Sequence, residues 1–125
     1  APENKIVEVK VSYDKEYIYF LLKGKYQFGK YNYQKNWLNL FIGTGSPKSQ
    51  GWESYNYVIG RKICNNSISI ETLSKDFNTR EKDMGRIMQE ANSIQISLPR
   101  SILDLDGEKK FISKWRWGYR DLPIS

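Results

Sequence analysis

The chain has no histidine and only one cysteine, Cys64, among its 125 residues. Without histidine, Ser-His-Asp and Cys-His catalysis are excluded, and the commonest transition-metal ligand is missing. A lone cysteine cannot form an intrachain disulfide and cannot complete the tetrahedral coordination of zinc. We therefore expect no zinc site, and we expect Cys64 to be a small buried residue on a strand.

Long hydrophobic runs are also missing. No stretch approaches the roughly 18 apolar residues of a membrane-spanning helix, so we expect no membrane span. The start, APENKIVEV, shows no signal peptide, which leaves open a removed signal or a chain cut from a longer protein. The net charge is +6, but the basic residues are dispersed, and the longest basic runs are pairs such as Arg61-Lys62. This pattern favours a solvated surface over a polyanion site, so we expect no nucleic acid partner.

Aromatic residues, in contrast, make up 14% of the chain. They stand out between residues 36 and 61, NWLNLFIGTGSPKSQGWESYNYVIGR, which reads as two strands joined by a loop rich in Gly, Pro and Ser. Trp37 and Trp52 lie near opposite ends of this segment. Large aromatics beside amides either pack under a loop or form a platform for a flat ligand, and both interpretations stay open here.

Short alternating segments run along the whole chain. The alternation predicts that Val7, Val9 and Val11 face a core, and that Leu38, Leu40 and Ile42 point to one side of a strand. The expected strands cover 6–11, 17–25, 37–43, 54–61, 67–73, 94–98 and 111–117, and residues 101–105 suggest one helical turn. Residues 82–91 fit a helix or a strand. We predict a single all-β domain over residues 1–125, an antiparallel, jelly-roll-like β-sandwich with at most one short helical turn.

The order of these segments resembles a known family. The hairpin VKVSYDKEYIYFLLKGK is followed by NWLNLFIGTG, GWESYNYVIGR, IQISLPRSILDL and FISKW. Together they are similar to family 9 carbohydrate-binding modules and related DOMON-like domains, most of all the accessory domains of Bacteroidetes surface and polysaccharide-degrading proteins. In that family the corresponding patterns run W-x-x-LFID and GWEGYDYVINR. The similarity covers nearly all of residues 6–117, and it favours a strand over residues 85–90.

The resemblance implies a non-catalytic module that binds carbohydrate, located outside the cell, in the periplasm or on the cell surface. An adjacent glycoside hydrolase domain in the same protein is the partner it implies. No cofactor is expected. Calcium occurs in relatives, but their acidic ligands have no match here, so the metal content stays open.

Both the aromatic residues of the sequence and the family resemblance indicate candidate ligand-binding residues. Aromatic planes complement the C–H faces of sugar rings, and amides bond their hydroxyls. In sugar-binding relatives two tryptophans sandwich the sugar beside a carboxylate. The resemblance implies that Tyr33 corresponds to the position of the first tryptophan and Asn39 to that of the carboxylate. Trp117 or Tyr119 corresponds to the second tryptophan. The full candidate set is Tyr31, Tyr33, Trp37, Asn39, Trp52, Trp117 and Tyr119. For Trp52 a loop anchor is the alternative, and we expect Trp115 to lie in the core.

Three departures from the family pattern support a second hypothesis. Gly43 replaces the Asp that ends LFID, and Gly60 replaces the Asn of VINR. Arg116-Trp117 follows Lys114-Trp115, where relatives continue with Ala-Asp-Asn. The alternative function is therefore a structural or interaction domain that has lost sugar binding.

Catalysis has little support. A glycosidase needs two carboxylates at a defined separation. The candidates, Glu53, Glu71, Asp104 and Asp106, fall on expected turns or outward strand positions, where we expect them to be solvated.

Overall fold

The computed structural model describes residues 5–28, 38–45, 52–105, 110–117 and 120–121, and within these ranges it contains nine β-strands and no helix. The strands are β1 (Ile6–Tyr13), β2 (Tyr17–Gly24), β3 (Leu38–Gly43), β4 (Tyr57–Cys64), β5 (Ser67–Leu73), β6 (Thr79–Glu90), β7 (Ser93–Pro99), β8 (Ile112–Trp117) and β9 (Arg120–Asp121). The all-β class is confirmed. Residues 101–104 form hydrogen-bonded turns after β7.

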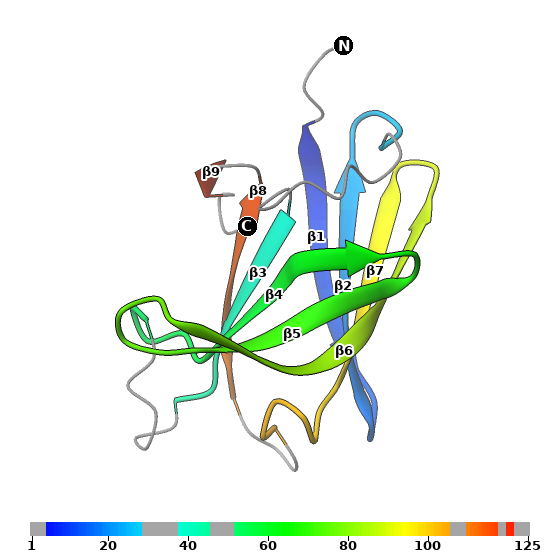
Figure 1. The fold of residues 1–125 in the computed structure, drawn as a ribbon. Helices are drawn as coiled ribbons and strands as arrows, with labels where there is room; N and C mark the ends of the chain where they lie inside the picture. The colour runs from blue at the N-terminus through cyan, green and yellow to red at the C-terminus, as the bar shows by residue number, and fades with distance from the viewer. Residues whose placement is uncertain (1–4, 29–37, 46–51, 106–109, 118–119, 122–125) are drawn as a thin grey trace.

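All nine strands belong to one antiparallel sheet in the order β1-β2-β7-β6-β5-β4-β3-β8-β9. Strands β3 to β7 follow one another as hairpins, whereas β2 pairs with β7 and β8 with β3 over long sequence separations. Strands β4, β5 and β6 cross in front of the upright β1, β2 and β7, so the sheet curls over on itself (Figure 1). Phe20 of β2 and Trp115 of β8 lie 5.8 Å apart between ring centroids. The two arms of the sheet thus face each other across a shared core, which gives the molecule its sandwich character.

The core follows from period-two alternation on the central strands. On β2, Ile18, Phe20 and Leu22 are buried, and they pair with Leu98, Ile96 and Ile94 of β7. On β3, Leu38, Leu40 and Ile42 enter the same cluster as Trp115, as the sequence predicts. Successive side chains of a strand point to opposite faces, so one face of each strand supplies this core.

The expectation for β1 is wrong in part. Val9 is half-buried against the core, but Val7 and Val11 keep 56% and 46% of their surface exposed. A bulge between Ile6 and Glu8 takes Val7 out of the pairing with β2. Because β1 is the last strand on its side of the sheet, nothing among the described strands lies beyond it to cover Val11.

The structure also decides the expectations for β6, for the start of β4 and for Cys64. The ambiguous segment is the long strand β6, so the strand interpretation is confirmed. Strand β4 begins at Tyr57 rather than at residue 54, because Trp52 and Tyr55 bond each other in a tight turn. Cys64 is exposed, so its predicted burial is wrong: it ends β4, directly before the Asn65-Asn66 turn. None of the described segments is a helix that could cross a membrane.

Candidate functional site

A second apolar layer covers the outer face of the sheet at β3, β4 and β5. Phe41, Val58 and Leu73, one from each strand, are buried there on the side opposite the main core. Trp52, Tyr55 and Phe77 from the flanking loops lie over them. The ring centroid of Phe41 is 5.3 Å from that of Trp52, and Trp52 meets Phe77 edge-on at 5.1 Å. Aromatic pairs at such separations stabilise the packing beyond the area that they bury.

Two cations from β8 lie on this aromatic layer. The Arg116 guanidinium is 5.3 Å from the Phe41 ring centroid and 5.6 Å from that of Trp52. The Lys114 ammonium is 5.7 Å from the Trp52 ring, and it also lies 3.9 Å from the Glu53 carboxylate. This edge of the face is therefore positively charged over an aromatic floor.

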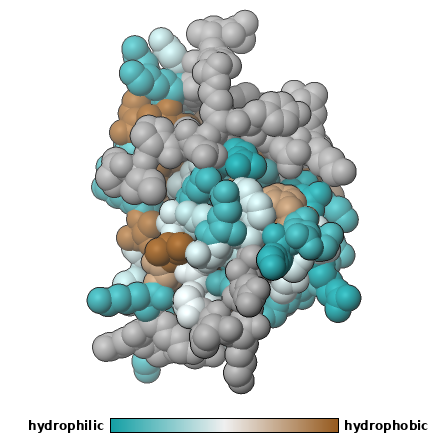
Figure 2. Space-filling model, turned by 90° about the vertical axis from the view of Figure 1, so that its left-hand side faces the viewer, coloured by the Kyte–Doolittle hydropathy of each residue, from teal (hydrophilic) through white to brown (hydrophobic). Residues whose placement is uncertain are grey.

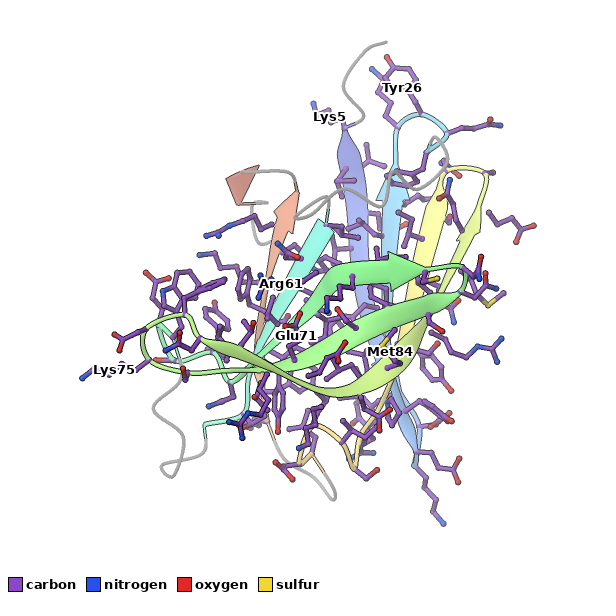
Figure 3. The ribbon with its side chains drawn as sticks, viewed as in Figure 1. Lys5, Tyr26, Arg61, Glu71, Lys75 and Met84 are labelled. Carbon is purple, nitrogen blue, oxygen red and sulfur yellow. The ribbon has the colours of Figure 1, made fainter. Side chains whose placement is uncertain are left out.

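A polar cluster adjoins the aromatic layer. Arg61 of β4 and Glu71 of β5 lie next to each other in front of the sheet (Figure 3), with the guanidinium Nη1 3.6 Å from the carboxylate Oε2. Arg61 also donates a hydrogen bond to the Thr79 hydroxyl at the start of β6. Asn39 and Ser69 are buried on the same outward positions of β3 and β5, and Ser69 accepts a hydrogen bond from the Lys62 backbone N–H.

An irregularity in β4 brings Arg61 to this cluster. Ile59 pairs with Ile70, and Ile63 pairs with Ile68. Between these two pairs the chain advances four residues along β4 but only two along β5. Simple alternation would place Arg61 on the core side with Ile59 and Ile63, and it was not among the predicted site residues. The signal in the sequence was Gly60, because an isolated glycine inside a strand often marks a bulge. Glu71 was expected to be solvated; that expectation is wrong, since only 6% of the residue is exposed.

The Arg61–Glu71 pair keeps unused hydrogen-bonding capacity. Buried polar atoms in proteins are nearly always paired, and exceptions call for an explanation. Within the described part of the chain, Arg61 Nε and Glu71 Oε1 are both buried and have no hydrogen-bond partner. One donor and one acceptor of this ion pair are thus left over, and because both atoms are closed off from solvent, a ligand hydroxyl reaches them only when one of the two side chains turns outward.

Only some of the predicted site residues lie in the part of the chain that the structure describes. Tyr31, Tyr33, Trp37 and Tyr119 lie outside the described residues. The backbone of Trp117 ends β8 opposite Leu38 and pairs with Arg120, and Asn39 lies in the polar cluster. Trp52 anchors its loop on Phe41, in agreement with the packing alternative. Trp115 is buried in the core, as expected.

The two glycines that depart from the family pattern are required by this backbone. Gly60 has φ +102°, and a Cβ there would overlap the Leu38 carbonyl oxygen. A Cβ on Gly43 would overlap the Ser54 carbonyl oxygen and approach the Ile112 side chain to 2.7 Å. Side chains like the family's Asp and Asn therefore do not fit at these positions, and the polar groups of the face come from Asn39, Arg61 and Glu71.

A second polar cluster lies at the start of β4, around the hydroxyl group of Tyr57. Tyr57 donates a hydrogen bond of 2.8 Å to Asp104, and Lys82 lies 3.3 Å from the same hydroxyl. Burial, followed by the bond to Asp104, raises the pKa of Tyr57 far above its ordinary value. Glu53 and Asp104 are exposed as expected, and Asp106 lies outside the described residues. Among the described side chains, no group of three or more acidic or cysteine residues could hold a metal ion.

A shallow groove of about 450 Å³ runs over β1, β2 and β7, lined by Lys10, Val11, Ser12, Tyr19, Leu21 and Gln95. It contains none of the predicted site residues. Figure 2 shows the side of the molecule that lies to the left in Figure 1, where most of the described surface is hydrophilic and hydrophobic atoms form small separate groups.

Comparison with known proteins adds no family to this description. No protein-family model matches the chain, and neither a curated protein nor a solved structure was found to match it.

Proposed function

We propose that this protein is a non-catalytic carbohydrate-binding module, and that it binds sugar on the outer face of β8, β3, β4 and β5. The observation that carries the proposal is the buried Arg61–Glu71 pair, in which one N–H donor and one carboxylate oxygen have no partner among the described residues. Buried charged groups are costly unless they are fully bonded, so a ligand that completes their bonds gains affinity there.

Sugar hydroxyls suit this chemistry because each hydroxyl both donates and accepts hydrogen bonds. Glu71 Oε1 accepts and Arg61 Nε donates, and Asn39 places an amide on the same face. Charge-assisted hydrogen bonds are about twice as strong as neutral ones, so these two side chains supply most of the directed contacts.

Aromatic stacking would come from residues that lie close to β3 and β8 in the sequence. Trp37 directly precedes β3, and Trp117 is the last residue of β8, the strand paired with β3. Together with Tyr31, Tyr33 and Tyr119 they are the proposed stacking residues. The sequence resemblance to family 9 carbohydrate-binding modules supports the same function, an extracellular, periplasmic or cell-surface location, and an adjacent glycoside hydrolase domain as partner.

The test is calorimetry with a broad panel of mono- and oligosaccharides. Glu71→Gln keeps the shape of the side chain but removes its charge, and we expect it to weaken binding at least about tenfold. The matched control is Glu81→Gln: Glu81 lies 3.7 Å from Lys62 in a pair that is more than half exposed, so affinity should not change. No binding across the whole panel would overturn the proposal.

A destabilised variant could lose binding by unfolding, so a second variant is needed. Replacing a buried ion pair by apolar residues of similar volume is often neutral or stabilising. Arg61→Met combined with Glu71→Leu should therefore stay folded, as judged by circular dichroism, and should still lose sugar binding. Retained binding in this folded double variant would assign the pair a structural role only.

One observation favours the alternative, an interaction domain without sugar binding. Trp52, Phe41 and Phe77 pack against one another, and Arg116 covers two of these rings. Rings that are used in this way are not available as a platform. Under this alternative, Trp37→Ala and Trp117→Ala change stability or the docking of a neighbouring domain, and calorimetry detects no sugar binding by the wild type.

A further inference from the structure

The edge of β1 that faces away from β2 is the second distinctive surface of the molecule, and it is independent of the proposed sugar site. β1 stands at one end of the sheet, and β2 is its only paired neighbour among the described strands. An edge strand presents unpaired backbone N–H and C=O groups that can accept another strand. Val7 and Val11 on this strand are about half exposed.

The sequence of β1 is symmetric in its chemistry about Val9. On one side of Val9 stand Glu8 and Val7, and on the other side stand Lys10 and Val11. Glu8 and Lys10 lie on the same face of the strand, because their charged atoms are 3.2 Å apart. When the direction of the strand is reversed about Val9, Glu8 therefore takes the place of Lys10, and Val7 takes the place of Val11.

We propose that two copies of this chain associate through β1, paired antiparallel about a two-fold axis at Val9. In this register Glu8 lies opposite Lys10 of the second copy, and Lys10 lies opposite its Glu8. The contact is isologous, as is usual for dimers of identical chains.

The charges decide the partner. Lysine on an edge strand normally opposes pairing with another chain, because its charge is buried against the incoming strand. Here each Lys10 meets a carboxylate on its own strand and another across the axis, so the four charges alternate in sign. Cross-strand pairs of opposite charge stabilise a sheet and like charges destabilise it, so a second copy fits this edge better than an unrelated strand.

Analytical ultracentrifugation of the full chain tests the pairing. The wild type should show a concentration-dependent monomer–dimer equilibrium. Glu8→Lys places four positive charges at the interface and Lys10→Glu four negative ones, so each alone should raise the dimer Kd at least about tenfold. The double variant Glu8→Lys with Lys10→Glu restores the alternation and should return the Kd to the wild-type range.

The mixing experiment is the sharpest test. Glu8→Lys and Lys10→Glu are complementary in the proposed register, so an equimolar mixture should form heterodimers although neither variant self-associates well. Lys75→Glu, in the exposed loop between β5 and β6, carries the same change of net charge as Lys10→Glu and should dimerise like the wild type. Circular dichroism establishes that every variant is folded. A wild type that stays monomeric up to about 1 mM, or a mixture of folded variants that stays monomeric, would overturn the proposal.

Discussion

At the scale of single residues, Asp14 organises the turn between β1 and β2. Its carboxylate accepts bonds of 2.8 Å from the backbone N–H groups of Glu16 and Tyr17, and one of 2.6 Å from the Tyr19 hydroxyl. The Tyr19 bond, followed by the two backbone bonds, lowers the pKa of Asp14 below its ordinary value of 3.8. Hydrogen bonds to the ionised form favour ionisation, and Tyr19→Phe removes the largest of these causes.

We therefore expect Tyr19→Phe to raise the pKa of Asp14 toward 3.8, measured by carboxyl carbon chemical shifts in an NMR titration. Because the folded pKa lies below the unfolded one, the stabilisation is complete above the unfolded pKa and is lost as pH falls through the folded pKa. The stability difference between wild type and variant should accordingly shrink on acidification below pH 3.8. An unchanged Asp14 pKa in the variant would contradict this assignment.

Gly60 is the residue on which the irregularity of β4 depends. Its φ of +102° disfavours any side chain, and a Cβ would also overlap the Leu38 carbonyl oxygen. Strained backbone positions of this kind cost about 1–3 kcal/mol, so Gly60→Ala should lower the free energy of unfolding by at least about 2 kcal/mol.

The control is Gly45→Ala, measured in the same urea titration. Gly45 also has a positive φ, +71°, but a Cβ there meets nothing within 4 Å. Both variants carry the conformational cost, and only Gly60→Ala adds the overlap. Equal losses of stability would show that backbone conformation alone demands the glycine at position 60.

At the scale of strands, β3 buries both of its faces and β1 buries little of either. Phe41 points away from the main core yet is fully buried under Trp52, whereas Val11 points toward the core and is 46% exposed. Truncating a buried phenylalanine typically costs about 3–5 kcal/mol, and surface substitutions about 0.5 kcal/mol or less. We expect Phe41→Ala and Val11→Ala to differ by at least about 2 kcal/mol in unfolding free energy, measured with urea; equal costs would contradict the burial of this face.

How far the sequence predicts these strands depends on their neighbours. Alternation predicts β2 and β7 well, because both lie inside the sheet and each hides one face. It fails on β1, where the curled sheet ends before it covers Val11. It fails at Arg61 as well, because alternation assumes a regular ladder and the extra residues of β4 change which way the side chain faces. Glycine at position 60 was the local clue, but a glycine marks an irregularity without giving its direction.

At the scale of the whole molecule, pairings between distant segments decide where the site lies. β8 joins β3 across more than 60 residues of chain, which sets Lys114 and Arg116 beside Phe41. No local pattern contains this pairing. The sequence therefore pointed to Asn39 and Trp52 but not to Lys114 and Arg116 of β8. Arg61 and Glu71 meet in the local β4–β5 hairpin, and they were missed because of the irregularity of β4.

The curl of the sheet is closed by contacts between its two arms, and the Phe20–Trp115 pair is the clearest of them. The rings meet edge-on, at 79° between planes and 5.8 Å between centroids. Such pairs contribute about 0.5–1.5 kcal/mol beyond their buried area. A double-mutant cycle with Phe20→Leu and Trp115→Leu, each of which removes one of the two rings, should give a coupling free energy in this range. The Trp115 indole N–H has no hydrogen-bond partner in the described structure, so Trp115→Leu also removes an unsatisfied donor, which offsets part of the cost of the cavity that it leaves.

The control cycle pairs Phe20→Leu with Phe41→Leu. These two rings belong to separate clusters on opposite faces of the sheet, so their effects should add within about 0.5 kcal/mol. Coupling in the first cycle without coupling in the second means that the two arms stabilise each other directly through the core. Additivity in both cycles would mean that each arm is held by its own strand ladder alone, and the outer face at β3 and β8 would then be free to shift relative to β2 without loss of stability.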